Sequence, residues 1–451
     1  MKKFLLTLLI VILALPGFAR DIEYAYEGQT LTYTIIDEEA KTVKTKAGWV
    51  DYYPGNEVSG NLVIPSQIKD GDEIYDVIGI GYSAFCGCSG LTSITIPESV
   101  TSIDMYAFSG CSSLTSIAIP ESVTEISEYT FYKCSSLTSI IIPESVTSIG
   151  KEAFDGCSSL TSIIIPESVT SIGERAFSVC SGLTSIVIPE SVTSIGSIAF
   201  AHCSGLTSIV IPESVTSIGS FAFAHCSGLT SITIPESVTE IGEGAFYICS
   251  SLTSINIPES VKEIGEYTFY ECSSLTSITI PDTVTSIGEG AFEGCSSLTS
   301  ITIPESVTSI GNQAFAECET LENVILPMKL ESLGSAVFEK SSSIKNVVFN
   351  GPTPVESTSD VFDNQVYENA TLYVCSGSQA LFMDVSPWKF FRNITDDRYI
   401  GIEGVEADFN EDAPCEVFNL NGVKIADSTD NLPSGIYVVR QGDTAKKVAV
   451  K

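Results

Sequence analysis

The chain has 451 residues, of which 56 are acidic and 22 are basic, so its formal net charge at pH 7 is −34. Proteins bind nucleic acids and anionic membrane surfaces largely through Lys and Arg, so this acidic composition argues against either as a partner. It favours an acidic protein whose copies repel one another, and such a polyanion can also attract divalent cations or basic partners.

Residues 1–19 are predicted to be a signal peptide. Two lysines precede an apolar run from Phe4 to Leu15, which is too short to span a bilayer comfortably. Gly17 and Ala19 place small residues at −3 and −1 of a cleavage site. We expect a protein without a membrane span that is secreted or held at the outer-membrane cell surface; an uncleaved N-terminal anchor is the alternative.

Residues 20–60 alternate polar and apolar side chains, as in Leu31 to Ile35, around a turn at residues 37–39. Alternation with a period of two is typical of a strand with one buried face. We therefore expect an N-terminal β cap in the form of a hairpin.

A repeat of 23 residues organises residues 61–350. Its cysteines recur without a slip at positions 88, 111, 134, 157, 180, 203, 226, 249, 272, 295 and 318. In one unit, Ile94 and Ile96 face the same side of a short strand, which Pro97 ends because proline cannot donate to a ladder. Residues 100–108 turn apolar groups inward along a second side that is extended or 3₁₀-like, and the repeat glycines, such as Gly150, suit a tight corner. One coil alone is marginal, so the pattern predicts a solenoid stabilised by its stacked neighbours, with little α-helix.

The repeat, written LxxIxIPxSVTxIGxxAFxxC, resembles that of the BspA-like leucine-rich-repeat surface proteins from about Asn61 to Asn350. The resemblance implies a right-handed leucine-rich-repeat solenoid of parallel strands with a short 3₁₀ or irregular convex side. It also implies adhesion to host matrix proteins or other cell-surface ligands, and it transfers no catalytic residue. We therefore expect a protein-binding molecule that is not an enzyme and needs no cofactor. The alternative is a glycan-binding module, for which the candidate residues are Tyr129, Tyr132, Tyr247, Tyr267 and Tyr270.

The period breaks after Ser341, which replaces the repeat cysteine, and residues 351–401 resemble the C-terminal cap seen after such repeats. Residues 402–451 form a separate small β module with strands expected at 416–424, 432–439 and 446–451. Its Gly-Ile-Tyr and terminal Lys-Val-Ala-Val-Lys signatures resemble the sorting domain of proteins exported by the type IX (Por) secretion system. A plain β cap is the alternative.

Three columns of the repeat could carry chemistry. The cysteines stack with parallel side chains about 4.8 Å apart, too far for disulfides, so we expect a column of buried thiols. His202 and His225 form either a metal or pH-sensing pair or two histidines at the solvent edge. The Ser and Thr residues are outward positions of the repeat and supply no oriented nucleophile.

An acid follows each repeat proline, which favours solubility and edge protection, with calcium binding as the alternative. These acids are Glu98, Glu121, Glu144, Glu167, Glu190, Glu213, Glu236, Glu259, Asp282 and Glu305.

The outward strand position varies between coils and indicates a binding site. Between Arg175 and Glu236 the only charged residues are Glu190 and Glu213. Contiguous exposed apolar surface marks partner sites, so we predict that four consecutive coils contact a protein ligand through Ile141, Ile164, Val187 and Val210. The alternative is that strand propensity and repeat duplication account for these residues.

Overall fold

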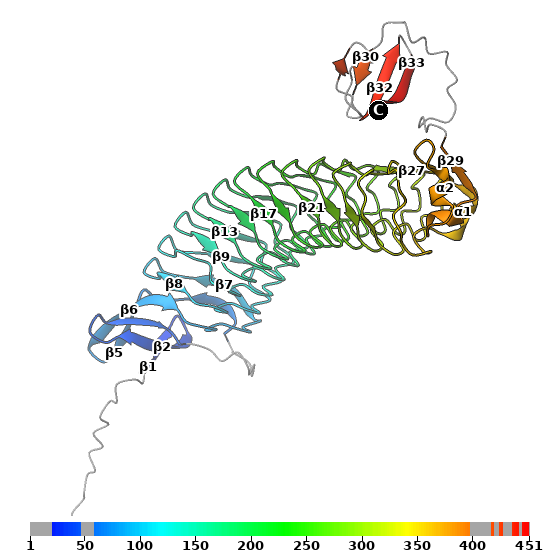
Figure 1. The fold of residues 1–451 in the computed structure, drawn as a ribbon. Coiled ribbons are helices and arrows are strands. Elements are labelled where there is room, and N and C mark those ends of the chain that lie inside the picture. The colour runs from blue at the N-terminus through cyan, green and yellow to red at the C-terminus, as the bar shows by residue number, and fades with distance from the viewer. Residues whose placement is uncertain are drawn as a thin grey trace, which may run out of the picture.

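A computed structural model of the chain describes residues 20–46 and 58–396, together with four strands nearer the C-terminus. The predicted signal peptide at residues 1–19 lies outside the described residues. Residues 58–396 form a curved rod of stacked coils (Figure 1). The leucine-rich-repeat solenoid predicted from the sequence is therefore confirmed.

The N-terminal end of the rod is covered by a sheet of order β1-β2-β3-β6-β5. Its strands are β1 (Asp21–Tyr26), β2 (Gln29–Asp37), β3 (Thr42–Thr45), β5 (Gln67–Asp70) and β6 (Glu73–Ile80). The first two strands form an antiparallel hairpin, and the predicted turn at residues 37–39 connects β2 to β3. In that turn the backbone N–H groups of Glu39 and Ala40 donate to the Asp37 carboxylate at 2.9 and 2.7 Å. Strand β6 also pairs with β8 (Ser102–Ile103), which joins this sheet to the coils.

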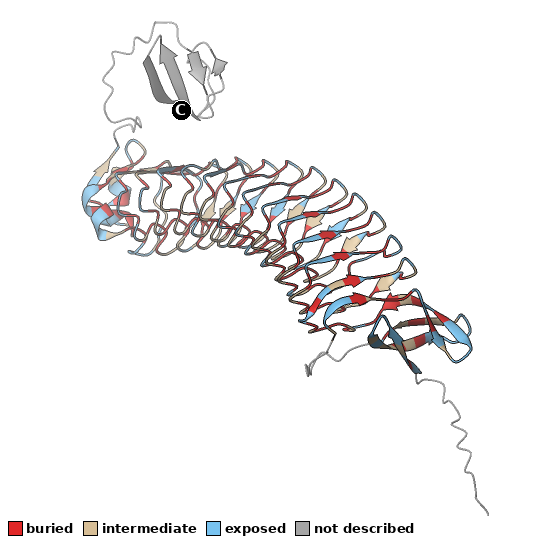
Figure 2. Cartoon of the chain, turned by 180° about the vertical axis from the view of Figure 1, so that it is seen from behind, coloured by how far each residue is buried: buried red, intermediate tan, exposed pale blue. Residues whose placement is uncertain are grey.

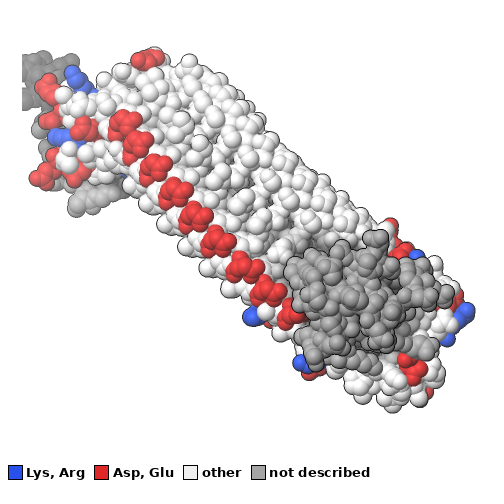
Figure 3. All heavy atoms as spheres, turned by 90° about the horizontal axis from the view of Figure 1, so that it is seen from above, with Lys and Arg blue, Asp and Glu red and all other residues white. Residues whose placement is uncertain are grey.

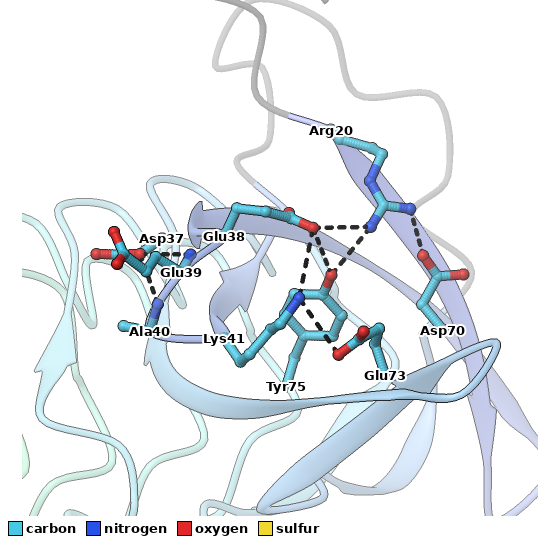
Figure 4. A network of polar contacts seen from close by, with 9 residues as sticks. All are labelled: Arg20, Asp37, Glu38, Glu39, Ala40, Lys41, Asp70, Glu73 and Tyr75. Carbon is cyan, nitrogen blue, oxygen red and sulfur yellow. Dashed lines mark hydrogen bonds and ion pairs between the residues drawn. The ribbon is translucent and has the colours of Figure 1, made fainter.

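Polar contacts join separate segments of this N-terminal sheet (Figure 4). The Tyr75 hydroxyl donates to Glu38 at 2.8 Å and accepts from Arg20 at 3.1 Å. Arg20 also pairs with Asp70, and Lys41 lies 3.3 Å from Glu73. These groups come from the residue before β1, the turn between β2 and β3, and the strands β5 and β6, so the contacts fix the end of the solenoid.

Each coil contributes one strand to a long parallel sheet of order β20-β18-β16-β14-β12-β10-β9-β7-β4. Residues 23 positions apart pair with each other, as in Ile163 with Ile186. The strands are β4 (Gly60–Val63), β7 (Leu91–Thr95), β9 (Ser116–Ala118), β10 (Ser139–Ile141), β12 (Ser162–Ile164), β14 (Ser185–Val187), β16 (Ser208–Val210), β18 (Ser231–Thr233) and β20 (Ser254–Ile255).

The sheet is resumed nearer the C-terminus, in the order β23-β25-β27-β28-β29. Its strands are β23 (Ser300–Thr302), β25 (Asn323–Leu326), β27 (Asn346–Phe349), β28 (Thr371–Tyr373) and β29 (Asn393–Thr395). The helices α1 (Asn364–Asn369) and α2 (Gln379–Phe382) and the 3₁₀ turn η1 (Trp388–Phe390) lie between these last strands. The Trp388 indole is fully buried and donates to the Val355 carbonyl at 2.7 Å.

The second side of each coil is extended, which was one of the two predicted alternatives. Strands of two residues pair in parallel, as in Ser194 with Ser217 and Ile195 with Ile218, and turns follow them. They are β11 (Ser148–Ile149), β13 (Ser171–Ile172), β15 (Ser194–Ile195), β17 (Ser217–Ile218), β19 (Glu240–Ile241), β21 (Glu263–Ile264), β22 (Ser286–Ile287), β24 (Ser309–Ile310) and β26 (Ser332–Leu333). Across residues 58–396, 3₁₀ helix is confined to η1.

Strands β30 (Glu416–Phe418), β31 (Lys424–Ala426), β32 (Gly435–Gln441) and β33 (Thr444–Val450) form an antiparallel sheet of order β31-β30-β32-β33. The segment expected as one strand over 416–424 is thus two strands that pair with each other.

The core is a set of columns that run the length of the rod. The columns consist of Leu183, Ile186, Val192, Ile195 and their equivalents in other coils, which are buried except for the half-buried Ile278. Figure 2 shows exposed residues beside buried ones on the short strands. The repeat phenylalanines stack along the axis, with 5.5 Å between the ring centroids of Phe177 and Phe200. Each buried side chain contributes about 1.5–3 kcal/mol relative to leaving it in water, but only once the neighbouring coil covers it.

The outward Ser and Thr residues tie neighbouring coils together, a role that the sequence did not reveal. The Ser214 hydroxyl donates to the Val192 carbonyl at 2.6 Å, and the Thr184 hydroxyl donates to the Thr161 carbonyl at 3.3 Å. The same contacts recur along the rod. A net hydrogen bond contributes about 0.5–1.5 kcal/mol, so these columns stabilise the stack of coils.

The close approach of two coils requires glycine at every repeat glycine position from Gly150 to Gly334 except Gly265. A Cβ atom on Gly219 would lie 2.5 Å from the Ser197 nitrogen and 2.7 Å from the Gly196 carbonyl carbon. The left-handed backbone positions lie elsewhere in the coil, where some coils carry other residues, such as His202 with φ 61°, and some carry glycine, such as Gly156 with φ 78°. The expectation of a glycine corner is therefore refined. These glycines leave space for the backbone of the neighbouring coil, and they do not adopt the left-handed backbone that favours glycine.

Candidate functional site

The four residues predicted to contact a partner lie on adjacent strands and point to solvent. The exposed fractions are 77% for Ile141, 80% for Ile164, 74% for Val187 and 69% for Val210. Their backbones pair in order across the sheet, Ile141 with Ile164, Ile164 with Val187 and Val187 with Val210. We call these four residues the apolar stripe. It crosses the strands and runs along the rod axis.

The surroundings of the apolar stripe are uncharged on one side and acidic on the other. An exposed serine lies two positions before each stripe residue, such as Ser162 before Ile164. An exposed glutamate lies three positions after each stripe residue, such as Glu167 after Ile164. The two residues between, here Ile165 and Pro166, are both buried.

The acids after the repeat prolines form a single file along the rod (Figure 3), which we call the acid row. Each acid occupies a tight turn that is closed by a hydrogen bond from valine to proline, as from the Val192 N–H to the Pro189 carbonyl at 3.0 Å. All members are exposed: Glu98, Glu121, Glu144, Glu167, Glu190, Glu213, Glu236, Glu259, Asp282 and Glu305. Within the described part of the chain, the ion pairs with Lys or Arg involve other acids.

The acid row does not gather into a metal site. Calcium takes six to eight oxygen ligands, whereas the coils supply single carboxylates one strand spacing apart. Across residues 20–46 and 58–396, no group of three or more His, Cys, Asp or Glu side chains is arranged to hold a metal ion.

The two histidines lie against each other. The ring centroids of His202 and His225 are 4.4 Å apart with 9° between the planes, and Tyr247 packs edge-on against His225 at 5.6 Å. Rings stacked face to face do not direct their nitrogens at one metal ion. Burial, followed by the charges of His225 and Arg175, lowers the pKa of His202. The arrangement fits two stacked rings at the solvent edge.

The repeat cysteines from Cys111 to Cys318 are buried thiols that form no disulfide. Each thiol donates to a phenylalanine carbonyl of the preceding coil, as from Cys203 to Phe177 at 3.2 Å. Burial raises the pKa of the Cys203 thiol far above its ordinary value, so it is held as the unreactive thiol. Ser341 makes the same contact, to the Phe315 carbonyl at 2.9 Å, which explains why it can replace a cysteine.

The tyrosines suggested for glycan binding all pack against other rings, Tyr132 and Tyr267 edge-on and the other three face to face. Tyr129 lies 4.5 Å from Tyr106 with 11° between the planes, and Tyr247 lies 4.7 Å from Tyr270 with 6° between the planes. Stacking covers one face of each of these three rings, Tyr129, Tyr247 and Tyr270. It leaves less aromatic surface on which a sugar could lie.

The hydroxyl groups of the repeat Ser and Thr residues described above are engaged in contacts between coils, where they donate to backbone carbonyls. The two histidines stack on each other. They therefore do not take part in the arrangement of hydroxyl, imidazole and carboxylate that serine hydrolases use.

Comparison with known proteins agrees with this description. The model of the BspA type leucine-rich-repeat region matches in six copies over residues 78–207, 172–295 and 262–373, more than half of the chain. No curated protein is similar enough to count as a match. No catalytic family is indicated, and in the described residues no helix is long and apolar enough to cross a membrane.

Two solved structures illustrate the similarity. A leucine-rich-repeat protein from Bacteroides ovatus is 32% identical, with a TM-score of 0.56, over 78% of this chain and 100% of that one. A leucine-rich cell surface protein from Faecalibacterium prausnitzii is 30% identical, with a TM-score of 0.44, over 73% of this chain and 94% of that one.

Proposed function

Because the chain belongs to the family of BspA-type leucine-rich-repeat proteins, we propose that it is an exported surface protein that adheres to other proteins. The leucine-rich-repeat fold is generally used for protein–protein interaction. The single observation that carries the proposal is the apolar stripe, whose four side chains are each at least 69% exposed on adjacent strands. Exposed apolar surface of this kind is costly in water and is typical of interaction sites.

In this proposal, residues 1–19 are the signal peptide and are removed near Ala19. The module at residues 402–451 acts as a sorting signal for the type IX secretion system. The ligands are proteins of the host matrix or of cell surfaces. The cell-surface description of the Faecalibacterium prausnitzii relative is consistent with this location.

The test removes the apolar stripe without disturbing the fold. A variant with all four stripe residues changed to threonine keeps β-branched side chains at exposed positions, where substitutions usually change the free energy of unfolding by less than about 0.5 kcal/mol each. A matched control changes two exposed threonines of the same column, Thr279 and Thr302, to alanine.

Binding of the mature protein to host matrix proteins and to whole cells is measured for both variants. We expect the threonine variant to lose binding, and we expect the control to bind like the unmodified protein. Unchanged binding by the threonine variant would overturn the proposed site.

A further inference from the structure

We propose that the apolar stripe and the adjoining part of the acid row together bind a basic amphipathic helix of the partner, lying along the rod axis. This inference rests on the proposed protein-binding function and specifies the chemistry of the ligand.

The two features are neighbours on every coil that carries the stripe. Each acid lies three positions after a stripe residue in the chain, a distance of at most about 11 Å between Cα atoms. The side chains between them are buried, as Ile188 and Pro189 are between Val187 and Glu190. A ligand that covers the stripe therefore reaches the acids without crossing another exposed side chain.

The charge of this surface requires a basic partner. The acids beside the stripe repeat at about 4.8 Å, so each carries like-charged neighbours on both sides. Glu190 and Glu213 are the only charged residues between Arg175 and Glu236, so no base of these coils offsets them. Lys or Arg side chains along one flank of a ligand would neutralise the acids. Neutral polar side chains along its other flank would face the exposed serines on the opposite side of the stripe.

The spacing of the stripe favours a helix over an extended segment. Four stripe residues span three strand spacings, or about 14 Å. An α-helix lying along the axis repeats its apolar side chains about every 5.4 Å, so three turns span about 16 Å and stay nearly in step. An extended strand presents same-face side chains about every 6.8 Å and would be about 6 Å out of step over the same three intervals.

The experiment uses the mature full-length protein and three synthetic helical peptides of about 18 residues. The basic peptide carries leucines at helical spacing and lysines along one flank. The acidic peptide has glutamates in place of the lysines, and a scrambled peptide keeps the basic composition without the apolar face. Binding is measured by fluorescence anisotropy at two salt concentrations, since neutralised charges make affinity depend on salt.

Two protein variants carry the same change of charge. One neutralises the acids beside the stripe, as Glu144→Gln, Glu167→Gln, Glu190→Gln and Glu213→Gln. The matched control neutralises the next four acids along the same row, as Glu236→Gln, Glu259→Gln, Asp282→Asn and Glu305→Gln.

We expect the basic peptide to bind more tightly than the acidic and scrambled peptides. The variant beside the stripe should lose at least about tenfold in affinity with a weaker salt dependence, and the control should change by less than about twofold. The threonine variant of the stripe should also lose binding. Equal losses in the two charge variants would show attraction to the whole polyanion and would overturn the inference, as would tighter binding of the scrambled peptide.

Failure of the inference is separable from failure of the proposed function. If the basic peptide does not bind while the threonine variant still loses its protein ligands, the stripe is the site and the partner is not a basic helix. If the threonine variant keeps its protein ligands, the proposed site itself is wrong.

Discussion

Substitution of one repeat glycine by alanine should separate the effect of coil spacing from that of backbone freedom. In Gly219→Ala the added Cβ atom would lie 2.5 Å from the Ser197 nitrogen, which belongs to the preceding coil. An ordinary close contact begins at 3.4 Å, so the two backbones must separate by 3.4 − 2.5 = 0.9 Å. The Gly219 N–H donates to the Ile195 carbonyl at 2.9 Å, and this separation would break that hydrogen bond.

The expected cost of Gly219→Ala is about 2–4 kcal/mol, from about 1–3 kcal/mol of overpacking and about 1 kcal/mol for the lost hydrogen bond. The chain provides a matched control in the same column. A Cβ atom on Gly265 would meet the Thr268 hydroxyl at 3.4 Å and the backbone of Glu243 only at 3.7 Å. Ser127 occupies the equivalent position in the other coil with threonine before its phenylalanine, so a side chain is accommodated there.

Gly265→Ala should therefore be neutral, or stabilising by about 0.4–1 kcal/mol because alanine lowers the entropy of the unfolded chain. Urea unfolding followed by circular dichroism gives both values. If the two variants lose the same stability, the glycines are needed for a reason other than space between coils. If neither loses stability, the coils are less rigid than the packing indicates.

Three further predictions concern the columns of the rod. Cys226→Ser should lower the free energy of unfolding by less than about 1 kcal/mol, since serine can donate to the Phe200 carbonyl as Ser341 donates to Phe315. Cys226→Ala should lower it by about 1–2 kcal/mol, and equal losses for the two variants in urea unfolding would contradict this. Because the folded protein lowers the pKa of His202, the unfolded chain binds the proton more readily, and this histidine makes the protein lose stability as the pH falls through its unfolded value of about 6.5. The urea midpoint should consequently fall less between pH 7.5 and 5.5 in His202→Asn, in which asparagine tolerates the left-handed backbone, and an identical fall would refute the reasoning. Millimolar calcium should leave the thermal midpoint unchanged, because a calcium ion could reach too few carboxylates; a rise of several degrees would reveal a site.

The sequence was sufficient to predict the solenoid because one signal was repeated many times. The alternation of Ile94 and Ile96, the proline that follows and the fixed 23-residue period identify the strand, its end and the pairing register. The exposure of the apolar stripe also followed from the alternation, since Ile141 lies next to the inward Ile140.

Contacts between coils were harder to predict. The hydrogen bond of a repeat serine or threonine joins it to a carbonyl 22 or 23 residues away, so the residue type alone does not distinguish it from a solvated hydroxyl. The glycine column appeared to be a corner because glycine is common in turns, and only the distance between neighbouring backbones shows why alanine is excluded. The stacking of His202 on His225 depends on side-chain orientation, which their 23-residue separation leaves open.

The partners of the outward hydroxyls have a consequence for how such a protein evolves. Ser214 and Thr184 bond to main-chain carbonyls, which every coil possesses whatever its side chains. A coil can therefore be duplicated or deleted as a unit of 23 codons, and each new junction finds the same acceptors. Tandem recombination can thus lengthen or shorten the rod between fixed ends, and selection can then adjust single exposed positions such as Ile164 without a compensating change in the neighbouring coils.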